Sequence, residues 1–284
     1  MASLFEPEGD AWSPTPLARG PWDPGALHGG PAAALVAREL ESIPTPGPML
    51  TARLTLELLR PVPFAPLTVR AETVRPGRRV QLLAATLEAG GQLVCRALAL
   101  RIRREPEPVA ELSTPDLPPG APGEGRDESL VGGLEDSFGG TAVEHRWVSG
   151  GWGVGPGTLW MRLKATIVPG EETSGLQRAA ALADFGNGVA AAVPWETHQF
   201  INPDLTVYLE REPEGEWLAL DAVTRADPAG TGVAESVLSD ARGRVGRGLQ
   251  ALYIARRERG AGAGGTARRS RVVQWPPEAG PQSR

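Results

Sequence analysis

The sequence has very few residues of the kinds that build disulfide frameworks or metal clusters. Cys95 is the one cysteine among 284 residues, so neither an intramolecular disulfide nor a cysteine cluster can form. The three histidines, His28, His145 and His198, are too far apart in sequence for the common zinc motifs. There is no P-loop for a nucleotide. We therefore expect no metal and no cofactor.

The sequence also lacks a positive charge excess and a long apolar run. Lys and Arg number 29 against 34 Asp and Glu, a net charge of −5, which gives no basic footprint for a nucleic acid. No run approaches the roughly 18 apolar residues of a membrane helix. The first ten residues have neither the basic nor the apolar region of a secretion signal. We expect a cytoplasmic protein without nucleic-acid or membrane partners.

Aromatic residues are scarce and turn formers are abundant. Aromatics make up 5% of the chain, so the core must consist mainly of Ala, Val and Leu. Gly and Pro number 36 and 28, more than a fifth of the chain against a usual share of roughly 12%. The Pro/Gly-rich segment 105–128 is predicted to be a linker and 260–284 a disordered tail. Two domains remain, 1–104 and 129–259.

Each domain reads as one helix followed by a series of strands. In the first, a small-residue helix starts near Pro31 and strands with two-residue alternation follow at 50–60, 67–75, 80–88 and 92–103. In the second, helical spacing runs over 174–185. Strands are predicted there at 142–149, 158–168, 205–212, 217–227, 232–240 and 245–257. This order predicts an α+β fold with antiparallel sheets.

The two domains are similar in sequence. LTLELLRP at 54–61 matches LTVYLERE at 205–212, and the run at 90–105 matches the run at 242–258, with shifts of 151 and 152 residues. Because two separate segments give nearly the same shift, we infer an internal duplication of one α+β unit.

Three short motifs occur in order within this duplicated plan. They are His28-Gly29-Gly30 before an Ala-rich helix, Ala181-Leu182-Ala183-Asp184-Phe185-Gly186 at a helix end, and Phe200-Ile201-Asn202-Pro203-Asp204-Leu205 at a strand start. With them, the chain resembles the acyl-CoA thioesterase II-like family over about 12–104 and 135–258. The resemblance implies a double hotdog fold, in which each of two tandem units has a central helix wrapped by an antiparallel sheet. It also implies hydrolysis of acyl-CoA, and the chain is expected to be a double hotdog by itself or to form a homo-oligomer.

The resemblance also implies a catalytic set. Family members use an Asp on the second helix, a Thr or similar group entering the next strand, and a Gln on the last strand. The matching residues are Asp184, Asn202 and Gln250, so Asn replaces the usual Thr. Thioester hydrolysis needs a positioned water and a proton acceptor. We predict that Asp184 is the general base and that both amides position its water.

Other residues near these motifs have competing interpretations. Gly29 and Gly30 could offer free helix N-terminal amides to a thioester carbonyl, or simply permit close packing. His28 could be an acid–base group or a structural residue at the helix start. Glu39 is the pseudo-equivalent of Asp184 in one helix register, although its neighbours Arg38 and Glu41 suggest a solvated face.

Two other functions remain open from the sequence. A hotdog dehydratase or hydratase would use a His–Asp pair, for which His28 could supply the histidine. A non-catalytic acyl-CoA-binding protein is the second alternative, and Asn at position 202 keeps it open.

Overall fold

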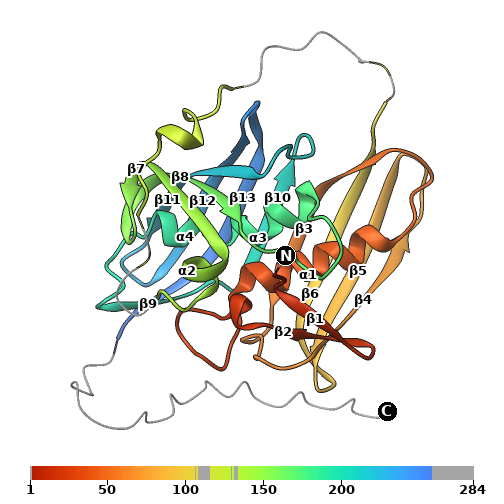
Figure 1. Ribbon diagram of the computed structural model, residues 1–284, viewed down its shortest axis with the longest axis horizontal. Coiled ribbons are helices and arrows are strands. Elements are labelled where there is room, and N and C mark those ends of the chain that lie inside the picture. The colour runs from red at the N-terminus through yellow and green to blue at the C-terminus, as the bar shows by residue number, and fades with distance from the viewer. Residues whose placement is uncertain (1, 106, 108–115, 129, 131–133, 258–284) are drawn as a thin grey trace.

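A long antiparallel sheet forms the body of the protein, and two helices pack against its centre (Figure 1). The computed structural model describes residues 2–105, 107, 116–128, 130 and 134–257. Within them, the first half of the chain supplies strands β1 (Phe5–Glu8), β2 (Ala11–Pro14), β3 (Met49–Leu58), β4 (Leu67–Arg75), β5 (Val80–Ala89) and β6 (Gln92–Arg103). The second half supplies β7 (Val143–Gly151), β8 (Val154–Leu163), β9 (His198–Ile201), β10 (Asp204–Leu209), β11 (Trp217–Ala226), β12 (Thr231–Asp240) and β13 (Gly243–Arg256).

The strand order shows how the two halves join. It runs β1-β2-β4-β5-β6-β3-β10-β13-β12-β11-β8-β7, and β9 pairs with β13. The halves therefore meet where β3 pairs with β10. At that seam Thr55 lies opposite Thr206, and the Thr206 hydroxyl donates to Thr55 Oγ1 at 3.2 Å. These two residues are 151 residues apart, the same separation as the sequence repeat.

The helices are α1 (Gly29–Ser42), α2 (Phe138–Ala142), α3 (Gly175–Ala183) and α4 (Gly186–Val189), with short 3-10 turns η1 (Pro16–Ala18) and η2 (Pro122–Glu124). Pro31 in the first turn of α1 has no amide hydrogen to leave unpaired, which suits that position. Ser174 caps α3 by accepting from the Gln177 amide at 3.1 Å. A proline in the first turn of α1 and a serine cap on α3 therefore mark where these two helices begin.

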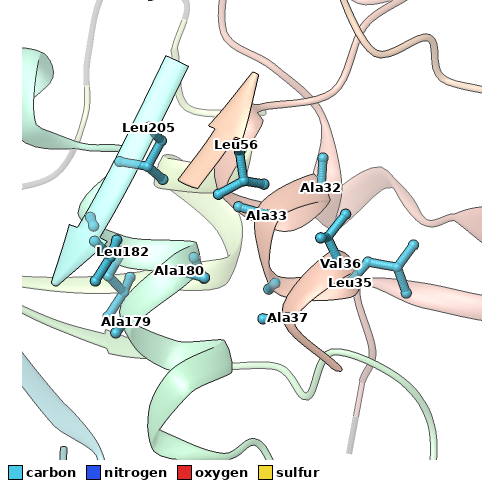
Figure 2. Close-up of a cluster of buried hydrophobic side chains, with 14 of the residues drawn as sticks. Ala32, Ala33, Leu35, Val36, Ala37, Leu56, Ala179, Ala180, Leu182 and Leu205 are labelled. Carbon is cyan, nitrogen blue, oxygen red and sulfur yellow. The ribbon is translucent and has the colours of Figure 1, made fainter. Parts of the chain in front are cut away.

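The core lies between α1, α3 and the middle strands, and it is built from small residues (Figure 2). On β3, Leu54 and Leu56 are fully buried while Thr55 between them faces away, as a two-residue period requires. The buried faces of the helices carry mostly alanine, namely Ala32, Ala33, Ala34 and Ala37 on α1 and Ala179, Ala180, Ala181 and Ala183 on α3. Short side chains let the two helix backbones approach each other closely.

The structure corrects the sequence interpretation in several places. The strand predicted at 158–168 ends earlier, because β8 stops at Leu163. Ile167 is instead buried next to the N-terminal segment, where its carbonyl accepts from the Phe5 amide. Strands β1, β2 and β9 were not predicted, since each has four residues and no clear alternation.

The predicted linker and tail are only partly within the described residues. Residues 106 and 108–115 of the linker and the whole tail 260–284 lie outside them. The described part of the linker touches the second half of the chain, because the Arg244 amide donates to the Asp116 carbonyl and Arg126 bridges to Trp147. None of the helices described is long and apolar enough to cross a membrane.

His145 on β7 should make the stability of the fold depend on pH. Its side chain is buried, and burial, followed by the nearby Lys164, lowers its pKa from 6.5 to about 4. The folded state therefore favours the neutral ring, whereas the unfolded chain takes up a proton below about 6.5. The contribution of His145 to the free energy of unfolding is complete above that pH. It is lost as the pH falls toward 4, by about 1.4 kcal/mol per pH unit.

This prediction is checked by urea unfolding at pH 7 and pH 4.5. The difference in unfolding free energy between the two pH values should shrink in His145→Phe, which keeps a ring beside Trp152 and Phe185. His198→Gln, at a more accessible histidine, is the matched control and should keep the wild-type difference. An unchanged difference in His145→Phe would contradict the assignment.

Candidate active site

Asp184 occupies the C-cap of α3, and its side chain is only 5% exposed. A carboxylate in this position is unfavourable for its own helix, because the C-terminal end of a helix carries a partial negative charge. The neighbouring N-terminus of α1 offsets this: a Cβ added to Gly29 would lie 2.7 Å from Asp184 Oδ2. Asp184 therefore lies between the end of one helix and the start of another.

Two amide side chains from the sheet converge on one oxygen of this carboxylate. Asn202, between β9 and β10, donates through Nδ2 to Asp184 Oδ1 at 2.7 Å. Gln250 on β13 donates through Nε2 to the same oxygen at 2.9 Å. Gln250 is 2% exposed, and its Oε1 accepts from the Asn187 amide at 3.3 Å. All three predicted residues thus meet, although the amides hold the carboxylate and do not point jointly at an open water position.

His28 also contacts Asp184. The sequence left open whether His28 is an acid–base group or a structural residue. It is the N-cap of α1, and its Nδ1 lies 2.9 Å from Asp184 Oδ2 and 3.1 Å from the Gly30 amide nitrogen. The imidazole ring stacks on Phe185, with ring centroids 4.8 Å apart, and packs against Phe138, with ring centroids 5.2 Å apart. The His-Gly-Gly motif at a helix start was the only sequence signal for this contact, and it does not identify the partner.

The two glycines of the motif meet different neighbours. A Cβ on Gly29 would meet the Asp184 carboxylate, whereas a Cβ on Gly30 would lie 2.2 Å from the backbone oxygen of Ala181. Real Cβ contacts are essentially never this short, so both positions need glycine. Gly29 makes room for the carboxylate, and Gly30 makes room for α3.

The remaining candidate residues lie apart from this cluster. Glu39 on α1 lies 3.7 Å from Arg38, with 28% of its side chain exposed, and makes no contact with Asp184 among the described residues. Burial, followed by the charge of Glu57, raises the pKa of the Cys95 thiol to about 12, so it is a poor nucleophile. Within the described ranges, no group of three His, Cys, Asp or Glu side chains could hold a metal ion.

Several solved structures share the fold of this chain, and one of them is described as having a hot dog fold. A protein of unknown function with a hot dog fold from Alicyclobacillus acidocaldarius is 21% identical, with a TM-score of 0.67 over 89% of this chain and 96% of that one. The tesB protein of Mycobacterium avium subspecies paratuberculosis is 14% identical, with a TM-score of 0.63 over 88% and 95%. An acyl-CoA thioesterase II from Mycobacterium marinum is 14% identical, with a TM-score of 0.58 over 90% and 96%. The fold is therefore of the hotdog class.

Sequence models of protein families identify the family within that class. The model of the acyl-CoA thioesterase C-terminal domain matches residues 110–254, and that of the acyl-CoA thioesterase N-terminal domain matches residues 18–102. The chain belongs to the acyl-CoA thioesterase family and is a thioester hydrolase. No curated protein sequence matches it significantly.

The two glycines should respond differently to alanine. Gly30→Ala should lower the unfolding free energy by about 1–3 kcal/mol, because the new methyl meets rigid backbone. Gly29→Ala should lower turnover by about tenfold or more with a smaller loss of stability, because the methyl displaces the carboxylate of Asp184, the predicted general base.

Gly47→Ala is the matched control, since a Cβ there meets nothing within 4 Å. Thermal unfolding and steady-state hydrolysis of an acyl-CoA measure both effects. Wild-type turnover in Gly29→Ala, or stability of Gly30→Ala equal to that of Gly47→Ala, would contradict this division of roles.

Proposed function

We propose that the protein hydrolyses acyl-CoA with a water activated by Asp184, on a double hotdog formed by units 1–104 and 129–259 and joined by segment 105–128. The single observation that carries the mechanism is the convergence of two amide donors on one oxygen of a nearly buried carboxylate at the start of α1. The family match over both halves and the β3–β10 seam between them support the double unit.

In this mechanism, Asp184 is the general base. Asn202 and Gln250 hold Oδ1, which leaves Oδ2 to accept a proton from water. The water oxygen attacks the thioester carbonyl carbon as its proton passes to Oδ2. When the tetrahedral intermediate collapses, the C–S bond breaks, and the CoA thiolate takes up the proton to leave as the thiol. The products are the free acid and CoA.

The start of α1 is suited to the negative charge that develops on the carbonyl oxygen. The first amides of a helix have no partner within it, and the macrodipole places partial positive charge there. Gly29 is the first residue of α1 and lies against Asp184 Oδ2. Its amide is the donor that we assign to the oxyanion.

One observation favours a second candidate function. The hydratase alternative needs a His–Asp pair, and His28 Nδ1 lies 2.9 Å from Asp184 Oδ2. The two reactions give different products, so a panel of acyl-CoAs assayed for free thiol and crotonyl-CoA assayed for hydration separates them. Thiol release without hydration is expected. Hydration without thiol release would favour the hydratase. If neither activity is found, a non-catalytic acyl-CoA-binding protein would be favoured.

Asp184→Asn is the sharpest test of the base. The amide keeps an oxygen that can accept from Asn202 and Gln250, so the fold should survive, but it cannot take a proton from water. Turnover should fall by roughly 10²–10⁴-fold. The Michaelis constant should change less, because the carboxylate acts on the water more than on bound CoA.

Two further variants complete this test. Gln250→Ala should cost less turnover than Asp184→Asn, because Asn202 still holds Oδ1. Glu39→Gln is the matched control on α1 and should remain near wild type, since Glu39 lies away from the cluster. Full activity in folded Asp184→Asn, or loss of activity in Glu39→Gln instead, would overturn the assignment.

A further inference from the structure

One ring nitrogen of His28 lies within hydrogen-bond distance of two groups that make opposite demands on it. Nδ1 is 2.9 Å from Asp184 Oδ2 and 3.1 Å from the Gly30 amide nitrogen. An ionised carboxylate can only accept a hydrogen bond, and an amide N–H can only donate one. Nδ1 serves the carboxylate when it carries a proton and the amide when it does not. The position of that proton decides the state of the site.

The carboxylate makes the stronger demand. A hydrogen bond to an ionised group contributes more than one between neutral groups, and an unpaired charge with 5% exposure is costly. The Gly30 amide, at a helix N-terminus, is one of several that have no partner inside the helix in any case. We propose that His28 is a positioning residue that carries its proton on Nδ1 and donates it to Asp184 Oδ2. This inference rests on the proposed function, in which Asp184 is the base.

The aromatic neighbours hold the ring in the orientation that this role needs. Phe185 stacks on the imidazole at 4.8 Å between centroids with 28° between the planes, and Phe138 contacts it at 5.2 Å. A ring held on these two sides keeps Nδ1 toward Asp184. Phe185 directly follows Asp184 in the chain, so the residue that stacks on the imidazole is covalently tied to the residue that the imidazole contacts.

The donor from His28 also limits where the water can bind. A carboxylate offers about four lone-pair positions. Asn202 and Gln250 occupy both positions on Oδ1, and His28 occupies one on Oδ2. Among the described residues no other side chain contacts Oδ2, so one position on it remains, and Gly29 lies against that oxygen without a side chain to cover it. During the reaction the water proton takes this last position, and the His28 bond is kept.

The tautomer of His28 can be read directly by the ¹⁵N resonances of its ring, without any substrate. The chain has three histidines, so His145→Phe and His198→Gln identify the His28 signals by elimination. In wild type, the neutral ring should carry its proton on Nδ1. In Asp184→Asn the two amide donors keep the Asn oxygen in the Oδ1 position, so its NH₂ faces His28. The proton of His28 should then move to Nε2.

Kinetics of two His28 variants separate this role from helix capping. Serine caps a helix well but is too short to reach Asp184, whereas asparagine places an amide where Nδ1 lies. His28→Ser should lose about 10- to 100-fold in kcat with little change in KM. His28→Asn should recover to within about fivefold of wild type. Both lose the ring that packs against Phe185 and Phe138, so both should unfold at a lower temperature than wild type and by similar amounts, which leaves the difference in kcat between them as the readout.

The results distinguish this inference from the mechanism that it rests on. A proton on Nε2 in the wild-type ring, or no change of tautomer in Asp184→Asn, overturns the role of His28 whatever the enzyme hydrolyses. Wild-type kcat in His28→Ser, or a loss in His28→Asn as large as in His28→Ser, overturns it also. Full activity in Asp184→Asn, with the tautomers as expected, would instead overturn Asp184 as the base.

Discussion

The close antiparallel contact between α1 and α3 is the constraint on which the candidate site depends. Gly30 lies against the backbone oxygen of Ala181, so the two helices touch without an intervening side chain. Only at this separation can the N-cap of α1, His28, reach the C-cap of α3, Asp184. The same contact places the partial positive charge of one helix start beside a carboxylate that its own helix disfavours. Packing of small residues and placement of the Asp184 carboxylate are therefore one property of the fold.

At the opposite end of the helix pair, a carboxylate at the end of α1 faces the start of α3, but no strand amide in the described part of the chain holds it. Glu41, in the last turn of α1, accepts from Ser174 Oγ at 2.8 Å and from Gln177 Nε2 at 2.7 Å at the start of α3. Burial, the largest influence, raises the pKa of the Glu41 carboxyl despite these donors. No strand amide contacts it among the described residues; instead, the buried Arg101 guanidinium donates to the Leu40 and Ile43 carbonyls. Leu98 pairs with Thr55 on β3 as Leu249 pairs with Thr206 on β10, so Gln250 corresponds to Ala99 in the strand register and the first half has no equivalent donor.

The sequence was informative wherever a signal is local or repeated. The alternation of Leu54 and Leu56 and the repeat between 54–61 and 205–212 predicted strands and duplication, because each lies within a short window. The pairing of His28 with Asp184 joins the two halves of the chain and depends on the register of α1 against α3. A shift of half a turn in that register exchanges Glu39 for Glu41, which is why the sequence alone could not decide which carboxylate of α1 faces α3.

Asn202, where the sequence resemblance implied a Thr, also fits this geometry. The Asn202 amide donates to Asp184 Oδ1 at 2.7 Å. The backbone after it is fixed on both sides: the Pro203 carbonyl accepts from the Leu58 amide at 2.7 Å, and the Asp204 carboxylate accepts from the Ala251 amide at 2.7 Å. Because β3 and β13 hold this short segment, a longer side chain than Thr can be placed accurately. The substitution therefore changes how far the side chain reaches but keeps the donor on which the orientation of the carboxylate depends.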